Sequence, residues 1–190
     1  PDVSSEETMA LIDRLVEEVV ATHGAIDILV NNGGITRDST LRKMNQEQWV
    51  DVINTDLTSV FYMTRMVVND MLANGYGRII NISSVNGEKG QFGQANYSAA
   101  KAGMHGFTKA VAQEVASKGV TVNTISPGYI ATPMIMEVPE EIREGIRKNI
   151  PVGRFGKPED IARVVSFLAH EDASFITGTN VSANGGQYMH

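Results

Sequence analysis

Apolar residues recur at helical spacing in some segments of the chain and form short unbroken runs in others. Over residues 4–24 the apolar positions lie on one face of a helix, which predicts an amphipathic helix. Ser4 and Glu7 have the spacing of a capping box at its start, and Gly24 suits its C-terminal cap. The same periodicity predicts further helices over residues 55–75, 96–119, 140–148 and 157–173.

Short, mostly apolar runs lie between these helices and are typical of strands buried inside a parallel sheet. They predict strands over residues 26–30, 77–84 and 120–128, and a last strand and turn within residues 176–186. Helix and strand alternate along the chain with turns of a few residues. This order predicts an α/β fold of three layers, with a doubly wound parallel sheet of the Rossmann type and one domain over residues 1–190.

Polar or glycine-rich segments follow the predicted strands. They read "NNGG" at 31–34, "SSVNG" at 83–87 and "SPGYIAT" at 126–132. In such sheets ligands bind outside the carboxyl ends of the strands, so we expect these segments to line one cleft. Tyr97 begins the helix after the second segment and would face this cleft together with Lys101.

Tyr97 and Lys101 lie four residues apart, a spacing that places two side chains on the same face of a helix. By spacing alone, the pair is a solvated Tyr and Lys on an exposed face. The alternative is a tyrosine whose proton is made labile by a fixed cation. An unperturbed Tyr has a pKa of about 10, so lowering it to near 7 takes about 4 kcal/mol. A nearby Lys in a partly dry cleft can supply this stabilisation.

Composition excludes several classes of site. The absence of cysteine excludes disulfides, zinc–thiolate centres and thiol nucleophiles. The net charge of −6 argues against a general nucleic-acid or anionic-membrane surface. No apolar run approaches the roughly 20 residues of a membrane span. We expect no metal site, because no metal-ligand spacing joins the four histidines, His23, His105, His170 and His190.

Four segments in the same order resemble the short-chain dehydrogenase/reductase family. "NNGG" is similar to its Asn-Asn-Ala-Gly turn, and "SPGYIAT" to its nicotinamide-side Pro-Gly segment. Ser84 stands 13 residues before Tyr97, and Tyr97-x-x-x-Lys101 matches the central signature. A lone Tyr-x-x-x-Lys is weak, but four matches that span essentially the whole chain are specific.

The resemblance implies a nicotinamide-dependent reduction with four catalytic positions. Tyr97 would be the general acid, Lys101 would lower its pKa and hold the ribose hydroxyls, and Ser84 would stabilise the charge on the carbonyl oxygen. The fourth position, usually Asn, is Asp56 here. In the family its backbone carbonyl holds a water of the proton relay, so Asp need not abolish activity. The implied cofactor-binding residues are Asp2, Val3, Asn31, Gly33, Gly34, Tyr97, Lys101, Pro127, Gly128, Ile130 and Thr132.

Structural alternatives remain for several of these residues. Ser84 could bond backbone groups at the end of a strand. Asn31 and Gly34 could form an ordinary turn. Gly33 replaces the usual Ala, and its backbone freedom would loosen the turn. Thr132 could instead cap a helix that begins at Pro133.

Within the family, "GITRD", "GQANY", "GRFGKPEDIA" and "NGGQYM" resemble the 3-oxoacyl thioester reductases, in particular those that reduce acetoacetyl-CoA with NADPH in polyhydroxybutyrate synthesis. This resemblance implies an acyl-CoA substrate, a homotetramer and a cytoplasmic location. The implied substrate-binding residues are Ser84, Gln91, Gln94 and Tyr129. Two alternatives stay open: reduction of acyl-carrier-protein thioesters, and a catalytically inactive assembly or binding module.

The family opens with a strand, a glycine-rich phosphate loop and a second strand that selects NADP or NAD. This sequence begins with neither an initiator Met nor these elements, and Asp2-Val3 resembles the adenine-contacting end of the third strand. We therefore expect a longer parent chain with its phosphate loop outside these residues. The choice between NADP and NAD is not encoded in the residues at hand.

Overall fold

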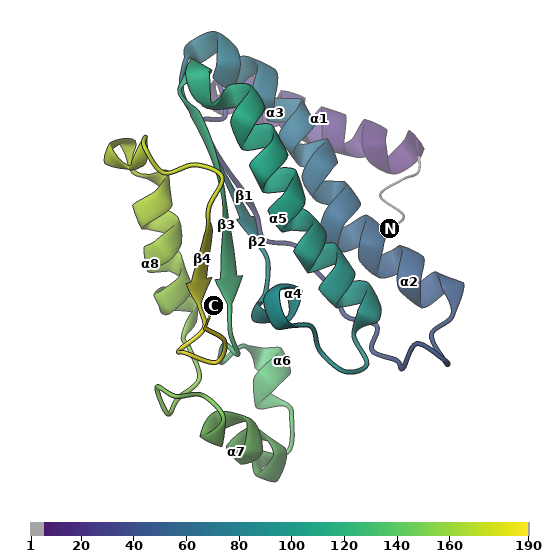
Figure 1. Ribbon diagram of the computed structural model, residues 1–190. Coiled ribbons are helices and arrows are strands. Elements are labelled where there is room, and N and C mark those ends of the chain that lie inside the picture. The colour runs from purple at the N-terminus through teal and green to yellow at the C-terminus, as the bar shows by residue number, and fades with distance from the viewer. Residues whose placement is uncertain (1–5, 190) are drawn as a thin grey trace.

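A computed structural model describes residues 6–189 as an α/β fold (Figure 1). Its strands are β1 (Ile28–Asn31), β2 (Gly77–Ile82), β3 (Val120–Pro127) and β4 (Asn180–Ala183). Its α-helices are α1 (Glu6–His23), α2 (Gln46–Ile53), α3 (Ser59–Asn74), α4 (Val85–Lys89), α5 (Ala95–Val115), α6 (Pro133–Met136), α7 (Glu140–Lys148) and α8 (Pro158–Ala169).

The four strands form one parallel sheet in the order β1-β2-β3-β4. In its centre Ile79 of β2 pairs with Leu29 on one side and with Val122 on the other. Every residue of β2 is buried, because helices cover both faces. The predicted parallel sheet with helices on both faces is confirmed.

Two separate cores hold the layers together. On one face α1, α3 and α5 pack on Ile79 and Val122. On the other face α8 packs through Leu168 on Ile80 and Ile125. Ile79 and Ile80 point to opposite faces because side chains alternate along a strand. The result is the predicted three-layer arrangement.

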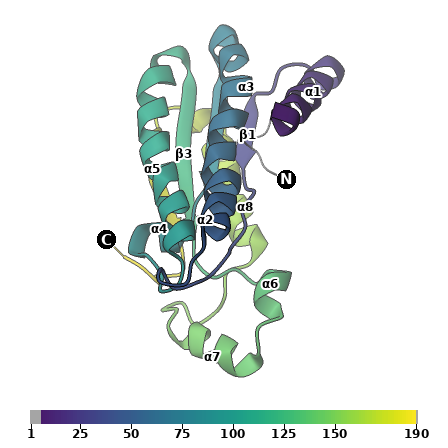
Figure 2. The same cartoon turned by 90° about the vertical axis from the view of Figure 1, so that its right-hand side faces the viewer.

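The connections between the strands do not all have the same hand. Each connection moves one strand further along the sheet, but α3 and α5 cross on one face and α8 on the other. The connection through α8 therefore has the opposite hand to the first two. It passes through α6 and α7, which lie beyond the carboxyl ends of the strands (Figure 1 and Figure 2).

Several element boundaries differ from those predicted. Two helices were missed, α2 and α4, while α6 begins at Pro133, as the structural alternative for Thr132 expected. The helical segment predicted over residues 55–75 begins earlier in the chain. Helix α2 continues directly into α3 through a π-helix, η1 (Asn54–Thr58). The strand predicted over 77–84 ends at Ile82, and the strand predicted within 176–186 is β4. Ser4 lies outside the described residues, so the predicted capping box is not tested.

No helix within residues 6–189 is both long and apolar enough to cross a membrane.

Candidate active site

The segments after β1, β2 and β3 meet at one cleft of about 240 Å³, as the sequence predicted. Helix α5 closes one side of it. The cleft is lined by Asn32, Gly34, Ile35, Thr36, Ile82, Ser83, Ser84, Tyr97, Lys101, Pro127 and Gly128. Tyr97 and Lys101 therefore face a cleft and do not form a solvated surface pair.

Ser84 stands two residues beyond the end of β2 and is the N-cap of α4. Its hydroxyl oxygen accepts a hydrogen bond of 3.1 Å from the backbone N–H of Asn86. The Ser84 side chain is also hydrogen-bonded to Tyr97. Ser84 thus bonds the backbone at the strand end, as the structural alternative expected, and its predicted role toward a carbonyl oxygen stays a prediction.

Lys101 is buried below Tyr97, with 3% of its surface exposed. Its Nζ donates a hydrogen bond of 3.1 Å to the carbonyl oxygen of Ile82 at the end of β2. The same Nζ lies 3.5 Å from Oδ2 of Asp56 and 5.5 Å from the ring centroid of Tyr97. The ammonium is thus held between a strand end, a carboxylate and the tyrosine ring.

Asp56 lies in the π-helix η1 and is fully buried. Its Oδ1 accepts a hydrogen bond of 2.8 Å from the backbone N–H of Ile35, directly after the "NNGG" turn. Burial raises the pKa of Asp56, while the charge of Lys101 and the Ile35 hydrogen bond oppose this rise. Burial also lowers the pKa of Lys101, against the opposing charge of Asp56.

The pKa of Tyr97 is raised above its ordinary value, and not lowered as the sequence predicted. Burial is the largest cause, the hydrogen bond with Ser84 opposes it, and the negative charges of Asp56 and Asp38 add to the rise. The prediction was wrong because burial of the Tyr97 hydroxyl, the largest cause, opposes a phenolate, and because the prediction considered Lys101 without its partner. The Lys101 charge is compensated by Asp56, which itself disfavours a phenolate.

Most of the predicted cofactor-binding residues lie at adjoining cavities. Gly34, Pro127 and Gly128 line the cleft, while Ile130 and Thr132 line a larger neighbouring cavity of about 650 Å³ that also contains Pro127. Space beside the Gly34 backbone is tight, because a Cβ there would lie 3.1 Å from both Asp56 Oδ2 and Lys101 Nζ. Two predicted residues lie outside the described ones, Asp2 and Val3.

The turn after β1 differs in detail from the prediction. Asn31 is buried and donates a hydrogen bond of 2.8 Å to Oδ1 of Asn81, so its side chain anchors β1 to β2. Its neighbour Asn32 lines the cleft instead. Gly33 does not have a positive φ, and a Cβ there would meet nothing within 4 Å. The turn therefore does not depend on the backbone freedom of Gly33.

Thr132 occupies the N-cap position of α6, before Pro133, but its side chain makes no capping hydrogen bond. It lines two of the cavities at the strand ends. The capping interpretation of Thr132 is therefore not supported.

A cavity of about 550 Å³ adjoins Ser84 and Tyr97 on the side of α6 and α7. Gln94 and Tyr129 line it, as expected of substrate-binding residues. Gln91 does not line it and is exposed, where its Oε1 accepts a hydrogen bond of 3.0 Å from Lys89. The structure thus brings together three of the four predicted substrate residues.

Both the nitrogen and the oxygen of the Gln94 side-chain amide form hydrogen bonds. Its Nε2 donates to both carboxylate oxygens of Asp38, at 3.1 and 2.9 Å, and its Oε1 accepts a hydrogen bond of 2.9 Å from Asn86. Asp38 also lines the cavity and was missed by the sequence analysis. It stands in "GITRD", which was used only as a family signature.

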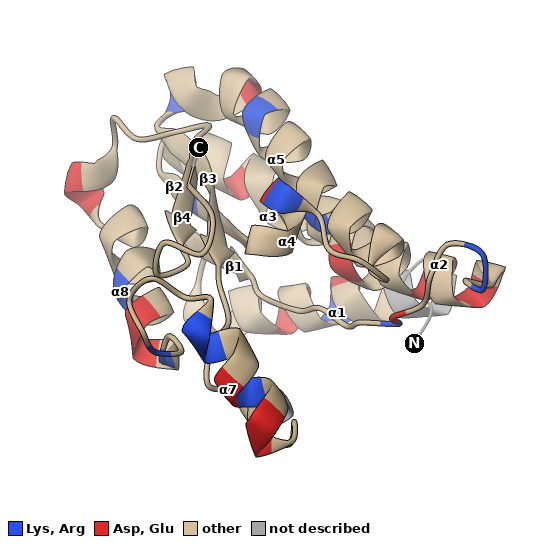
Figure 3. Ribbon diagram, turned by 60° about the horizontal axis from the view of Figure 1, so that its bottom comes forward, with Lys and Arg blue, Asp and Glu red and all other residues tan. Residues whose placement is uncertain are grey.

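The outer wall of this cavity is apolar and comes from α6, α7 and the link between them. Its residues are Ile135, Val138, Ile142 and Ile146. The other face of α7 carries acidic and basic residues in alternating bands (Figure 3). This amphipathic helix was predicted, but its position over the cavity was not.

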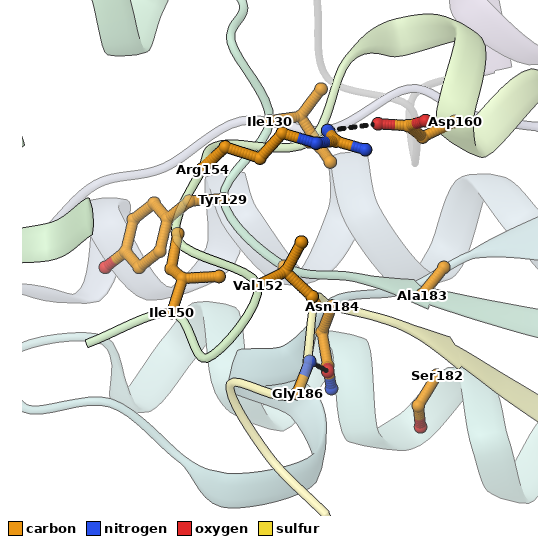
Figure 4. A pocket seen from close by; sticks show the side chains of 13 residues that line it. Tyr129, Ile130, Ile150, Val152, Arg154, Asp160, Ser182, Ala183, Asn184 and Gly186 are labelled. Carbon is orange, nitrogen blue, oxygen red and sulfur yellow. Dashed lines mark hydrogen bonds and ion pairs between the residues drawn. The ribbon is translucent and has the colours of Figure 1, made fainter. Parts of the chain in front are cut away.

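A separate cavity of about 250 Å³ lies behind the Tyr129–Ile130 segment (Figure 4). Arg154 forms an ion pair with Asp160 there, with Nη1 2.7 Å from Oδ2. Ser84, Tyr97 and Lys101 are not part of its lining.

No group of three or more His, Cys, Asp or Glu residues within the described part of the chain could hold a metal ion.

Comparisons with known proteins place this site in a family. The family model described as enoyl-(acyl carrier protein) reductase matches residues 1–188. The chain belongs to the short-chain dehydrogenase/reductase family, whose members are nicotinamide-dependent oxidoreductases. The family prediction made from four sequence segments is confirmed.

Individual relatives are similar over almost the whole chain. An acetoacetyl-CoA reductase of Allochromatium vinosum is 57% identical over 100% of this chain and 76% of that relative's length. An acetoacetyl-CoA reductase of Rhizobium meliloti is 58% identical over 99% of this chain and 77% of its own. A 3-oxoacyl-(acyl-carrier-protein) reductase of Escherichia coli is 48% identical over 95% of this chain and 74% of its own.

Proposed function

We propose that the protein reduces acetoacetyl-CoA to 3-hydroxybutyryl-CoA with NADPH, as part of polyhydroxybutyrate synthesis. One observation carries the proposal: Ser84, Tyr97 and Lys101 meet at a cleft that continues into a cavity lined by Gln94 and Tyr129. The names of relatives more than 50% identical support the substrate.

The residues of the cleft suit a ketone reduction. NADPH, when bound, supplies the hydride for the carbonyl carbon. The Tyr97 hydroxyl then donates its proton to the carbonyl oxygen, and the Ser84 hydroxyl donates a hydrogen bond to the same oxygen as charge develops. The raised pKa of Tyr97 keeps the hydroxyl protonated at neutral pH, which the reductive direction requires.

The same cleft fits a dinucleotide at its nicotinamide end. Lys101 supplies a buried cation for ribose hydroxyls, and a side chain on Gly34 would crowd Lys101 and Asp56 at the floor of the site. Thr132 adds a hydroxyl that makes no capping hydrogen bond to α6. These residues support a nicotinamide cofactor, and the preference for NADPH rests on the sequence resemblance to the NADPH-dependent acetoacetyl-CoA reductases.

A second substrate class is a 3-oxoacyl thioester of acyl carrier protein. It is favoured by the 48% identity to the Escherichia coli carrier-protein reductase. Both substrate classes present the same acyl group to the cavity. They differ only in the carrier of the thioester, CoA or acyl carrier protein, which lies outside the cavity. An inactive assembly module is disfavoured, because the catalytic side chains are held in one hydrogen-bonded and ion-paired cluster.

We further propose a cytoplasmic homotetramer. Large apolar side chains are exposed on two sides of the molecule, and such patches mark interfaces. Trp49 and Phe61 lie on α2 and α3, while Phe167 and Phe175 flank the end of α8 beside β4.

The decisive assay follows NADPH consumption with acetoacetyl-CoA and with acetoacetyl-(acyl carrier protein) side by side. We expect turnover of both, with the higher kcat/KM for the CoA thioester. A preference for the carrier-protein thioester would move the protein to fatty acid synthesis. No turnover of either, together with no NADPH fluorescence change on titration, would favour the assembly module.

A further inference from the structure

The side chain of Asp56 joins two parts of the site that the family resemblance treats separately. Oδ1 accepts the backbone N–H of Ile35 at 2.8 Å, and Oδ2 lies 3.5 Å from Lys101 Nζ. The carboxylate is fully buried, and a Cβ on Gly34 would lie 3.1 Å from both Oδ2 and Nζ. Asp56 is therefore enclosed between the turn after β1 and the catalytic lysine.

The charges around Tyr97 are few within the described part of the chain. Lys101 faces it from its own helix, Asp56 from η1 and Asp38 from the loop before α2. Tyr129 lies across the adjoining cavity, and the strand ends contribute neutral groups. Of the two carboxylates, only Asp56 also pairs with Lys101, so it acts on both members of the catalytic pair.

We propose that the Asp56 carboxylate is a positioning residue that fixes Lys101 and keeps the proton on Tyr97, so that the acid form that reduction needs persists to higher pH. This proposal rests on the proposed ketone reduction and adds a side-chain role at a position where the family usually has Asn. A negative charge beside Lys101 stabilises its ammonium, and the same charge destabilises a phenolate on Tyr97.

The two directions of the reaction need opposite forms of Tyr97. In reduction, the Tyr97 O–H bond breaks and its proton goes to the carbonyl oxygen that has gained the hydride's electron pair. In oxidation, the phenolate takes the alcohol proton while the hydride leaves for the oxidised cofactor. A group that holds the proton on Tyr97 therefore extends the first direction to higher pH and raises the pH at which the second begins.

The test compares Asp56→Asn with the unaltered protein across pH, in both directions. Asn keeps the shape and an oxygen for the Ile35 N–H but removes the charge. We expect the alkaline limb of kcat/KM for reduction to move down by about one pH unit, a typical effect of one neighbouring charge. We also expect the acidic limb of the oxidation profile to move down by about the same amount. Asp51→Asn removes the same charge from a half-exposed surface pair with Arg37 and should move neither profile.

A second readout needs no turnover. Tyrosinate absorbance is titrated in the unaltered protein and in Asp56→Asn, each with Tyr97→Phe subtracted to isolate Tyr97. We expect Tyr97 to ionise at lower pH when Asp56 is replaced. If Asp56→Asn does not fold by circular dichroism, Asp56→Ser, which keeps a hydroxyl for the Ile35 N–H, takes its place with the same expected shifts.

The outcomes separate this proposal from the proposed function. An unaltered protein that reduces neither thioester overturns the function, and the absorbance titration then decides the role of Asp56 alone. An active protein whose pH profiles and tyrosinate titration are unchanged by loss of the Asp56 charge overturns the positioning role and leaves the function standing.

Discussion

Burial and the negative charges of Asp56 and Asp38 favour the protonated form of Tyr97, while its hydrogen bond with Ser84 opposes them. Replacing its hydroxyl removes the proton donor and leaves the ring in place. We expect Tyr97→Phe to lower kcat for acetoacetyl-CoA by about 10²–10⁴-fold, the usual contribution of a general acid. NADPH consumption measures the loss. Tyr62→Phe, on α3 and away from the cleft lining, should keep full activity. A Tyr97→Phe protein with near-normal turnover would show that another group is the acid.

Gln94 and Gln91 give a matched pair of amides only three residues apart. Gln94 lines the acyl cavity and is held by Asp38 and Asn86, while Gln91 is outside it. We expect Gln94→Ala to raise the KM for acetoacetyl-CoA by about tenfold, the loss of roughly one hydrogen bond, with NADPH affinity unchanged. Gln91→Ala should have a much smaller effect. Steady-state kinetics with each substrate varied in turn measure both, and parallel losses toward thioester and NADPH would contradict the assignment of Gln94.

The residue-level chemistry was predictable from sequence only in part. Ser84, Tyr97 and Lys101 were identified because their spacing matches a family pattern and because strand ends meet in space. Asp38 was not identified, and Asn31 was predicted where Asn32 lines the cleft. Both depend on which side chain of a loop or turn points into the cavity. The predicted direction of the Tyr97 pKa shift was wrong, because the shift depends first on the burial of the hydroxyl and then on the charge of Asp56, which stands 45 residues before Lys101 in the chain and pairs with it.

At the scale of elements, helix α2 could have been found from the sequence. Asn45 and Gln48 form a capping box, in which Asn45 Oδ1 accepts from the Gln48 N–H at 2.8 Å and Gln48 Oε1 accepts from the Asn45 N–H at 3.0 Å. The Asn-x-x-Gln signature stands in the printed sequence. The π-helix that follows has no comparable signature. It is stable here because tertiary packing buries Asp56 against α5 and the turn after β1.

The junction from α5 to β3 depends on one glycine. Gly119 has a φ of +79°, and a Cβ there would lie 2.2 Å from the carbonyl oxygen of Gly75. We expect Gly119→Ala to lower the free energy of unfolding by at least about 2 kcal/mol, because it combines backbone strain with a clash against backbone atoms. Chemical denaturation monitored by circular dichroism measures the change.

Gly106, inside the same α5 helix, is the matched control. A Cβ there would meet nothing within 4 Å, and its φ is helical. Gly106→Ala should therefore raise stability by up to about 1 kcal/mol through helix propensity. Similar denaturation midpoints for the two variants would argue against the close approach of Gly119 to Gly75.

At the scale of the whole molecule, the chain order of helices and strands was enough to predict the parallel sheet and its three layers. The change of face at α8 was not predictable from that order, because nearly all such connections share one hand. It places α6, α7 and Thr132 over the strand ends, next to the cleft. The acyl cavity thus follows from a global property of the chain path, whereas the catalytic pair follows from a local spacing.

The proposed tetramer is tested at the exposed apolar residues beside the last strand. Phe175 is fully exposed and stands five residues before β4 in the sequence, and β4 pairs only with β3 within the described residues. If a second copy covers this edge, Phe175→Ser places a hydroxyl in an apolar interface and should shift tetramers toward smaller species. Sedimentation velocity at matched concentrations measures the shift. Leu41→Ser, which removes an apolar side chain that is 75% exposed on the loop before α2, should leave the distribution unchanged. A monomeric unaltered protein, or equal distributions for both variants, would place the contact between copies elsewhere or remove it altogether.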